Sequence, residues 1–237
     1  RVSVRDLSRG LIVDSGNDAC VALADYVAGG QPQGDRVSVR DLSRGLIVDS
    51  GNDACVALAD YVAGGQPQFV ALMNQYVEKL HLRDTHFETV HGLDAPGQHS
   101  SAYDLAVLSR AIIHGEPDVY HMYSQKSLTW NGITQQNRNG LLWDKTMNVD
   151  GLKTGHTSGA GFNLIASAVD GQRRLIAVVM GADSPKGREQ QAAKLLHWGQ
   201  QNFDTVQVLQ KGQKVAPSVS GTAIKSRLSS APIRISG

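Results

Sequence analysis

The chain has 237 residues, of which 41% are hydrophobic and 19% are charged, and its 23 basic and 22 acidic side chains leave a net charge of +1. The chain therefore lacks the excess of positive charge that is typical of nucleic-acid-binding proteins. No apolar run approaches the roughly 20 residues of a membrane-spanning helix. The first residue is Arg1 and no signal-peptide pattern follows, which predicts a processed or incomplete sequence of the soluble globular class.

The beginning of the chain is one segment present twice. Residues 1–33 recur without a single change at 36–68, and Gly34 and Asp35 join the two copies. Repeats in solenoid proteins number at least three, so a perfect pair is typical of a recent duplication or an artefact, with a functional tandem as the alternative. Only the second copy runs directly into its downstream sequence. We therefore expect residues 1–35 to be poorly packed, or to compete with the second copy for one place in the fold.

Three helices are predicted in the second copy and just after it. Ser38 followed by Asp41 is a capping signal, and apolar residues then recur at helical spacing. The triplet Ser50-Gly51-Asn52 interrupts this pattern. A second helix is expected over 53–62 and a third over 69–80.

The remaining pattern predicts a mixed domain. Residues 81–100 lack a period and are expected to form a long ordered loop, and Ser101 opens another helix. Two apolar segments flank Asp170-Gly171, which is a strong hairpin signal. Helices around a hairpin-built antiparallel sheet predict an α+β fold, a three-layer α/β/α domain. Strands are expected over 163–170 and 173–180, and the last helix over 189–203. The domain is expected to span 36–208, followed by an irregular tail over 209–237.

Two short motifs carry the chemical signal. Ser50-Gly51-Asn52 and Lys153-Thr154-Gly155 are each weak alone. Together and in this order they match two of the three elements S-x-x-K, S-x-N and K-T-G of serine enzymes that recognise penicillin. An acyl-transfer site needs a nucleophile, a base and oxyanion donors, and a Lys–Thr pair at a strand edge suits a substrate carboxylate.

The resemblance extends well beyond these motifs. Residues 36–208 resemble the low-molecular-mass penicillin-binding proteins that are D-alanyl-D-alanine carboxypeptidases, closest to the 5/6/6b group of enteric bacteria, with the 6b branch nearest. The stretches that carry this resemblance are His91–Gly97, Gln136–Leu142, Val149–His156 and Lys186–Glu189.

The resemblance implies a role for each matching residue. Ser50 would pass a proton toward the leaving D-alanine, Asn52 would contact the substrate amide, and Lys153 would support both the proton network and the substrate carboxylate. The substrate-binding residues would be Lys153, Thr154, Gly155, His156 (through its backbone N–H in the oxyanion hole), Arg188 and Arg138. His91 would brace a loop rather than act as a base. The copies Ser15 and Asn17 are expected to be non-functional.

The nucleophile of that family is missing from the sequence. None of the nine lysines has a serine three residues before it, so S-x-x-K does not occur. Loss of the nucleophile in a serine hydrolase costs on the order of 10⁶ in turnover. The resemblance also implies that the N-terminal strands, the nucleophile helix, the second domain and a C-terminal membrane anchor are missing. We therefore expect a truncated, inactive carboxypeptidase homologue with uncovered apolar surface.

Three alternatives stay open. The chain is a non-catalytic binder of peptidoglycan or β-lactams, or a β-lactamase of the same superfamily, or a metal-binding protein using His81, His86 and His91. The spacing of five between these histidines does not stack them on one helix face, which argues against the metal site. The expected partners are stem peptides ending in D-Ala-D-Ala and β-lactams, with no cofactor and no metal. The expected compartment is the periplasm, beside the inner membrane when the anchor is present.

Overall fold

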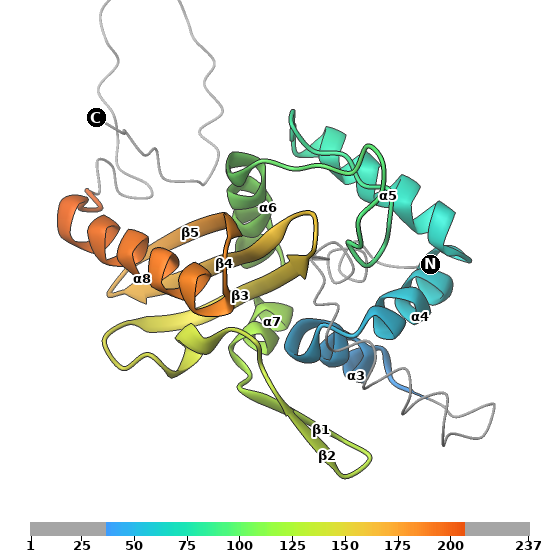
Figure 1. Cartoon of the computed structure of the whole chain (residues 1–237), viewed down its shortest axis with the longest axis horizontal. Helices are drawn as coiled ribbons and strands as arrows, with labels where there is room; N and C mark the ends of the chain where they lie inside the picture. Colours follow the sequence, from blue (N-terminus) through green and yellow to red (C-terminus); the bar gives the residue numbers. More distant parts are fainter. Residues whose placement is uncertain (1–36, 207–237) are drawn as a thin grey trace, which may run out of the picture.

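A computed structural model describes residues 37–206 (Figure 1). The first copy of the duplicated segment, with Ser15 and Asn17, lies outside the described residues, as does the expected tail 209–237. None of the described helices is long and apolar enough to cross a membrane.

The second copy of the repeat forms the helices that carry the Ser-Gly-Asn triplet. Helix α3 (Val39–Arg44) begins at Ser38, whose hydroxyl accepts a hydrogen bond from the N–H of Asp41, as the sequence predicts. A short π-helix, η1 (Gly45–Asp49), follows without a break and ends at Ser50. Helices α4 (Asn52–Ala63) and α5 (Gln66–Lys79) complete the group, and Gly64 ends α4 in the left-handed conformation.

A long loop, one long helix and two short helices connect this group to the sheet. Residues 81–100 contain one isolated bridge, between His86 and His99, and otherwise no regular element. Helix α6 (Ala102–Gly115) begins at Ser101, whose side chain accepts from the N–H of Asp104. The elements α7 (Pro117–Tyr120) and η2 (His121–Ser124) follow.

The described strands form two separate antiparallel sheets. The sequence analysis missed the small hairpin of β1 (Ser127–Trp130) and β2 (Ile133–Gln136), because its strands have only four residues each. After the 3₁₀ turn η3 (Gly140–Trp143) come three antiparallel strands in the order β3-β4-β5. They are β3 (Asn148–Thr157), β4 (Gly161–Asp170) and β5 (Arg173–Ala182), and helix α8 (Pro185–Asn202) follows them.

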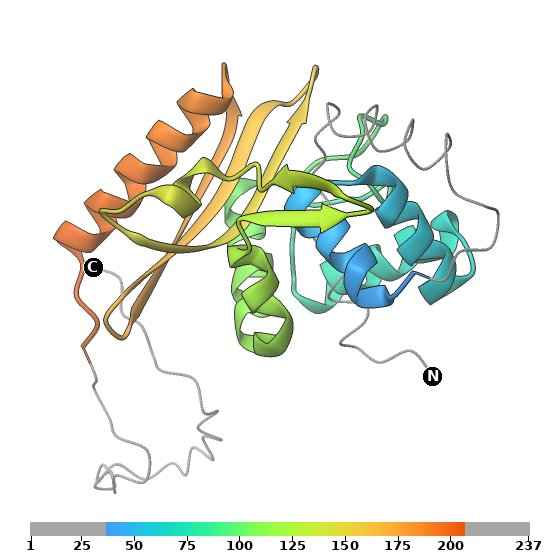
Figure 2. The same ribbon diagram turned by 90° about the horizontal axis from the view of Figure 1, so that it is seen from below.

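The three-layer arrangement is confirmed. Helix α8 packs on one face of β4 and β5, and α6 packs on the other face with the remaining helices beyond it (Figures 1 and 2). Two apolar clusters fill the two interfaces. Leu152 and Ile165 belong to the cluster on the side of α3–α7, whereas Leu164 and Ala166 belong to the cluster under α8. Because successive side chains of a strand point to opposite faces of the sheet, the residues of the sheet are divided between two cores.

A polar clamp fixes the start of β3. Arg174 on β5 donates to both oxygens of Asp150 at 2.6 and 2.8 Å, and the hydroxyl of Tyr120 donates to the same carboxylate at 2.8 Å. Burial raises the pKa of Tyr120, so its phenol stays protonated and remains a donor. The clamp sets the strand that bears Lys153 against the helical part of the domain.

Candidate active site

Ser50 and Lys153 meet although 103 residues separate them in the sequence. Ser50 ends η1 with left-handed backbone angles (φ 59°, ψ 36°), which turns its side chain out of the helix axis toward β3. The ammonium of Lys153 donates to the Ser50 hydroxyl and, at 2.8 Å, to the carbonyl of Thr154. Both side chains are buried, so this charge-assisted contact is shielded from water. The structure thus brings together the two motifs singled out in the sequence.

The K-T-G strand borders a cleft. A cavity of about 310 Å³ is lined by Thr154, Gly155 and His156 from β3, and by Arg138 and Arg188 opposite them. Within the described residues β3 pairs only with β4, so its other edge offers backbone donors and acceptors. Five of the residues that the sequence analysis assigned to substrate binding therefore line one cleft.

The two arginines are held differently. Arg188 is 5% exposed and donates to the carbonyl of Gly155 at 3.1 Å, and its guanidinium lies over the ring of Phe162. Arg138 is more open, with about a third of its side chain exposed, and faces the carboxylate of Asp49 at 3.8 Å. Arg188 is thus built into the wall of the cleft, whereas Arg138 presents its charge to the opening.

Phe162 is a cleft residue that the sequence analysis missed. Its ring stacks on His156 at 3.8 Å between centroids with an interplanar angle of 6°. His156 is further fixed through Nδ1, which lies 3.0 Å from the carbonyl of Gly161. Cross-strand pairing of His156 with Phe162 beside the β3–β4 turn produces this stack. Phe162 lies one residue before the predicted start of this strand at 163, and the strand begins at Gly161.

Asn52 is not among the residues that line this cleft. It is the first residue of α4 and is partly buried, and its side chain has no hydrogen-bond partner within 37–206. The other member of the triplet, Gly51, is the N-cap of α4 with an extended backbone. The triplet therefore places Ser50 in contact with Lys153. The contact of Asn52 with a substrate amide stays a prediction.

The loop 81–100 is tied to the end of β3. Thr157 donates through its hydroxyl to Asp94 at 2.6 Å, and the N–H of Gly159 donates to the same carboxylate at 3.3 Å. His91 accepts a hydrogen bond from the N–H of Leu93 through Nδ1, and burial lowers the pKa of its imidazole. This contact within the loop fits the bracing role expected of His91.

The histidines proposed for a metal site do not gather. His86 lies 3.0 Å from the carboxylate of Glu88 and across the isolated bridge from His99, apart from His81 and His91 in the loop. Among residues 37–206 no group of three or more histidine, cysteine or acidic side chains is arranged to hold a metal ion.

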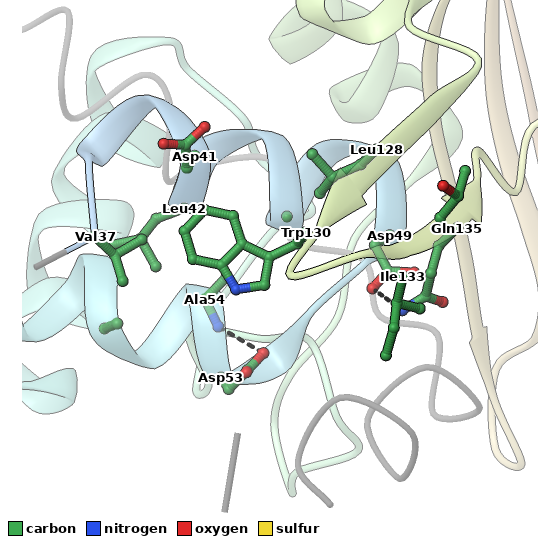
Figure 3. A pocket seen from close by; sticks show the side chains of 13 residues that line it. Val37, Asp41, Leu42, Asp49, Asp53, Ala54, Leu128, Trp130, Ile133 and Gln135 are labelled. Atoms are coloured by element: carbon green, nitrogen blue, oxygen red, sulfur yellow. Dashed lines mark hydrogen bonds between the residues drawn. The ribbon is translucent and has the colours of Figure 1, made fainter. Parts of the chain in front are cut away.

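A second, larger cavity lies between the β1–β2 hairpin and helices α3 and α4. Its volume is about 540 Å³, and its walls are mainly apolar side chains of α3, α4 and the hairpin, with Trp130 at the centre (Figure 3). Asp41, Asp49 and Asp53 also line it. Asp49 is 1% exposed, and its Oδ2 accepts from Gln135 at 2.9 Å. Sequence analysis overlooked Asp49 because it belongs to no motif.

Comparison with known proteins settles the family. The peptidase S11 family model, described as D-alanyl-D-alanine carboxypeptidase, matches residues 1–34 and again residues 31–184. The chain belongs to the peptidase S11 family. The resemblance to low-molecular-mass penicillin-binding carboxypeptidases is confirmed.

Several S11 relatives match most of the chain. D-alanyl-D-alanine carboxypeptidase DacD of Escherichia coli K12 is 88% identical over 215 residues, which are 91% of this chain and 46% of that protein. DacA of Haemophilus influenzae is 55% identical over 217 residues, 91% of this chain and 46% of that protein. The chain spans about half the length of these curated relatives.

Solved S11-type structures share the fold. Penicillin-binding protein 6B from Escherichia coli superposes with a TM-score of 0.76 at 72% identity, covering 91% of this chain and 74% of that one. Penicillin-binding protein D2 from Listeria monocytogenes, solved in its ampicillin-bound form, gives a TM-score of 0.68 at 29% identity over 84% of this chain and 86% of that one. The α+β, penicillin-binding fold expected from the sequence is confirmed.

Proposed function

We propose that this chain carries the recognition half of a serine-type D-Ala-D-Ala carboxypeptidase site, and that its substrates are peptidoglycan stem peptides and their β-lactam mimics. The observation that carries the proposal is the buried contact between Lys153 and Ser50 at the edge of the K-T-G strand. Membership of the S11 family supports the reaction class, which is removal of a terminal D-alanine through an acyl-enzyme.

The cleft has the chemistry that a peptide carboxylate needs. An extended peptide can pair with the free edge of β3 through its main chain, as in strand addition. Its terminal carboxylate then meets the hydroxyl of Thr154 and the exposed guanidinium of Arg138, a planar donor suited to carboxylates. The backbone N–H of His156 is assigned to the oxyanion of the scissile carbonyl. In a site completed by a nucleophile, Ser50 would pass a proton toward the leaving amine, and Lys153 would support that proton network.

Turnover requires a nucleophile that these 237 residues do not supply in S-x-x-K form. We propose that the chain by itself binds its ligands without cleaving them, which unites the carboxypeptidase assignment with the alternative of a non-catalytic binder. The cavity of about 540 Å³ beside Trp130 agrees with the expectation of uncovered apolar surface. We place the protein in the periplasm, where stem peptides occur.

Binding of a defined peptide tests this proposal. We expect Ac-L-Lys-D-Ala-D-Ala to bind the chain, and the same peptide with a C-terminal amide to bind at least about tenfold more weakly, because one charge-assisted hydrogen bond to a carboxylate is then lost. Isothermal titration calorimetry measures both. The peptide ending in L-Ala-L-Ala is the stereochemical control. Equal affinity for the acid and the amide would contradict the assignment of the cleft to a carboxylate.

A further inference from the structure

Asp49 lies directly before Ser50 and faces the arginine that opens into the cleft. Its side chain is 2% exposed, and its two oxygens point to two residues of the hairpin region. Oδ2 accepts from the side-chain amide of Gln135 at 2.9 Å, and Oδ1 lies 3.8 Å from a terminal nitrogen of Arg138 (Figure 3 shows Asp49 and Gln135). Oδ1 has no hydrogen-bond partner within the described part of the chain.

The backbone of Arg138 is fixed independently of Asp49. The two flanking residues are Asn137 and Asn139, and both are buried. Asn137 donates to the carbonyl of Gln125 at 2.9 Å, and Asn139 donates to the carbonyl of Gly151 on β3 at 3.1 Å. Only the long side chain of Arg138 is therefore left to be oriented, and among the described residues Asp49 is its ion-pair partner.

We propose that Asp49 is a positioning residue, which holds the Arg138 guanidinium at the cleft and so links substrate-carboxylate recognition to the Ser50 turn. This inference rests on the proposed function for its ligand and adds a residue that the family motifs do not contain. A free arginine side chain loses much rotamer freedom when it binds a ligand, and a partner that already orients it removes part of that cost. Asp49 acts through Arg138 and does not itself touch the ligand.

The charge state of Asp49 makes its positioning of Arg138 depend on pH. Burial raises the pKa of Asp49 to about 6, repulsion from Asp53 adds to the increase, and the charges of Arg138 and Lys153 oppose it. Because the folded-state pKa lies above the usual 3.8, this group favours folding most below pH 3.8, and that contribution is lost as the pH rises through about 6. Below about pH 6 the carboxyl is neutral, and its hold on Arg138 is released.

The Asp49→Asn variant tests the inference. It keeps the shape of the side chain and an acceptor for Gln135, and at neutral pH it removes a buried charge, so we expect it to be at least as stable as the parent protein. We expect Ac-L-Lys-D-Ala-D-Ala to bind it about tenfold more weakly at pH 7.5. Asp41→Asn is the matched control, since it removes a carboxylate from the same cavity away from Arg138.

The pH profile separates positioning from a merely structural role. The parent protein is expected to lose affinity as the pH falls from about 7.5 to about 5, and Asp49→Asn is expected to lack this loss. Parent-like affinity and pH dependence in Asp49→Asn would overturn the inference, and so would tighter binding, which would mean that Asp49 only screens Arg138.

A ligand-free measurement keeps this inference separate from the proposed function. The Nε–H resonance of Arg138, assigned by its disappearance in Arg138→Lys, reports the order of that side chain in ¹⁵N-arginine-labelled protein. We expect it to shift and to exchange faster with water in Asp49→Asn but not in Asp41→Asn. If no protein binds the peptide, the proposed function fails, and an unchanged resonance would then refute the positioning role as well.

Discussion

The Lys153→Met variant is expected to lose binding of Ac-L-Lys-D-Ala-D-Ala while remaining folded. Lys153 is buried, and its ammonium joins Ser50 to the K-T-G strand. The family resemblance also assigns this ammonium to the substrate carboxylate, so the variant would lose one charge-assisted contact with the peptide. Loss of a hydrogen bond to a charged group costs about 1.5–3 kcal/mol, which corresponds to a decrease in affinity of about 10- to 150-fold. Methionine has a similar volume and carries no charge, so the removed desolvation cost offsets the lost contacts and stability changes little.

Titration calorimetry with thermal unfolding of the same samples checks this result. Lys145→Met is the control. Lys145 is exposed in the turn before β3, so this substitution removes the same charge at a position outside the cleft. If a folded Lys153→Met protein bound the peptide as tightly as the parent, the Lys153–Ser50 hydrogen bond would serve only the fold and not ligand recognition.

The largest stability losses are expected from two leucines on opposite faces of the sheet. Leu152 on β3 packs toward the helices and Leu164 on β4 packs under α8, and each is 1% exposed. A buried Leu→Ala change costs about 2–5 kcal/mol, because a cavity remains where the side chain was. Total stabilities of about 5–15 kcal/mol make either loss a large fraction of the whole.

Urea unfolding of Leu152→Ala, Leu164→Ala and the double variant measures these losses. The two sites lie in separate clusters, so we expect the double variant to show nearly the sum of the single effects. Met180→Ala is the control, since that side chain on β5 is 44% exposed and its truncation should cost less than about 0.5 kcal/mol. A small loss for Leu164→Ala would mean that α8 does not form a packed layer.

The sequence predicted those parts of the fold that local signals specify. Ser38 and Ser101 begin helices as caps, and Asp170-Gly171 turns the β4–β5 hairpin, all as expected from residue type alone. The β1–β2 hairpin was missed because four-residue strands give too short a period to detect. The last helix begins at Pro185, four residues before the predicted start at 189, because Ser184 caps it.

The candidate site was predictable only where motifs mark it. Ser50, Lys153 and Thr154 belong to short patterns with a known chemical meaning, and the structure brings Ser50 to Lys153 as the motif order implies. Phe162 and Asp49 carry no motif, and their importance comes from what lies opposite them in space, His156 and Arg138. The Asp49–Arg138 pair depends on packing between segments far apart in the sequence, and the His156–Phe162 stack depends on the register of the β3–β4 hairpin. No residue pattern marks either pair.

The intact mass of the purified chain after incubation with benzylpenicillin tests the central claim most directly. We expect an unchanged mass from folded protein, because the 237 residues contain no S-x-x-K serine for the drug to acylate. A mass increased by one drug molecule would contradict it. Peptide mapping would then identify an acylated serine, and the chain would have to be regarded as a working carboxypeptidase.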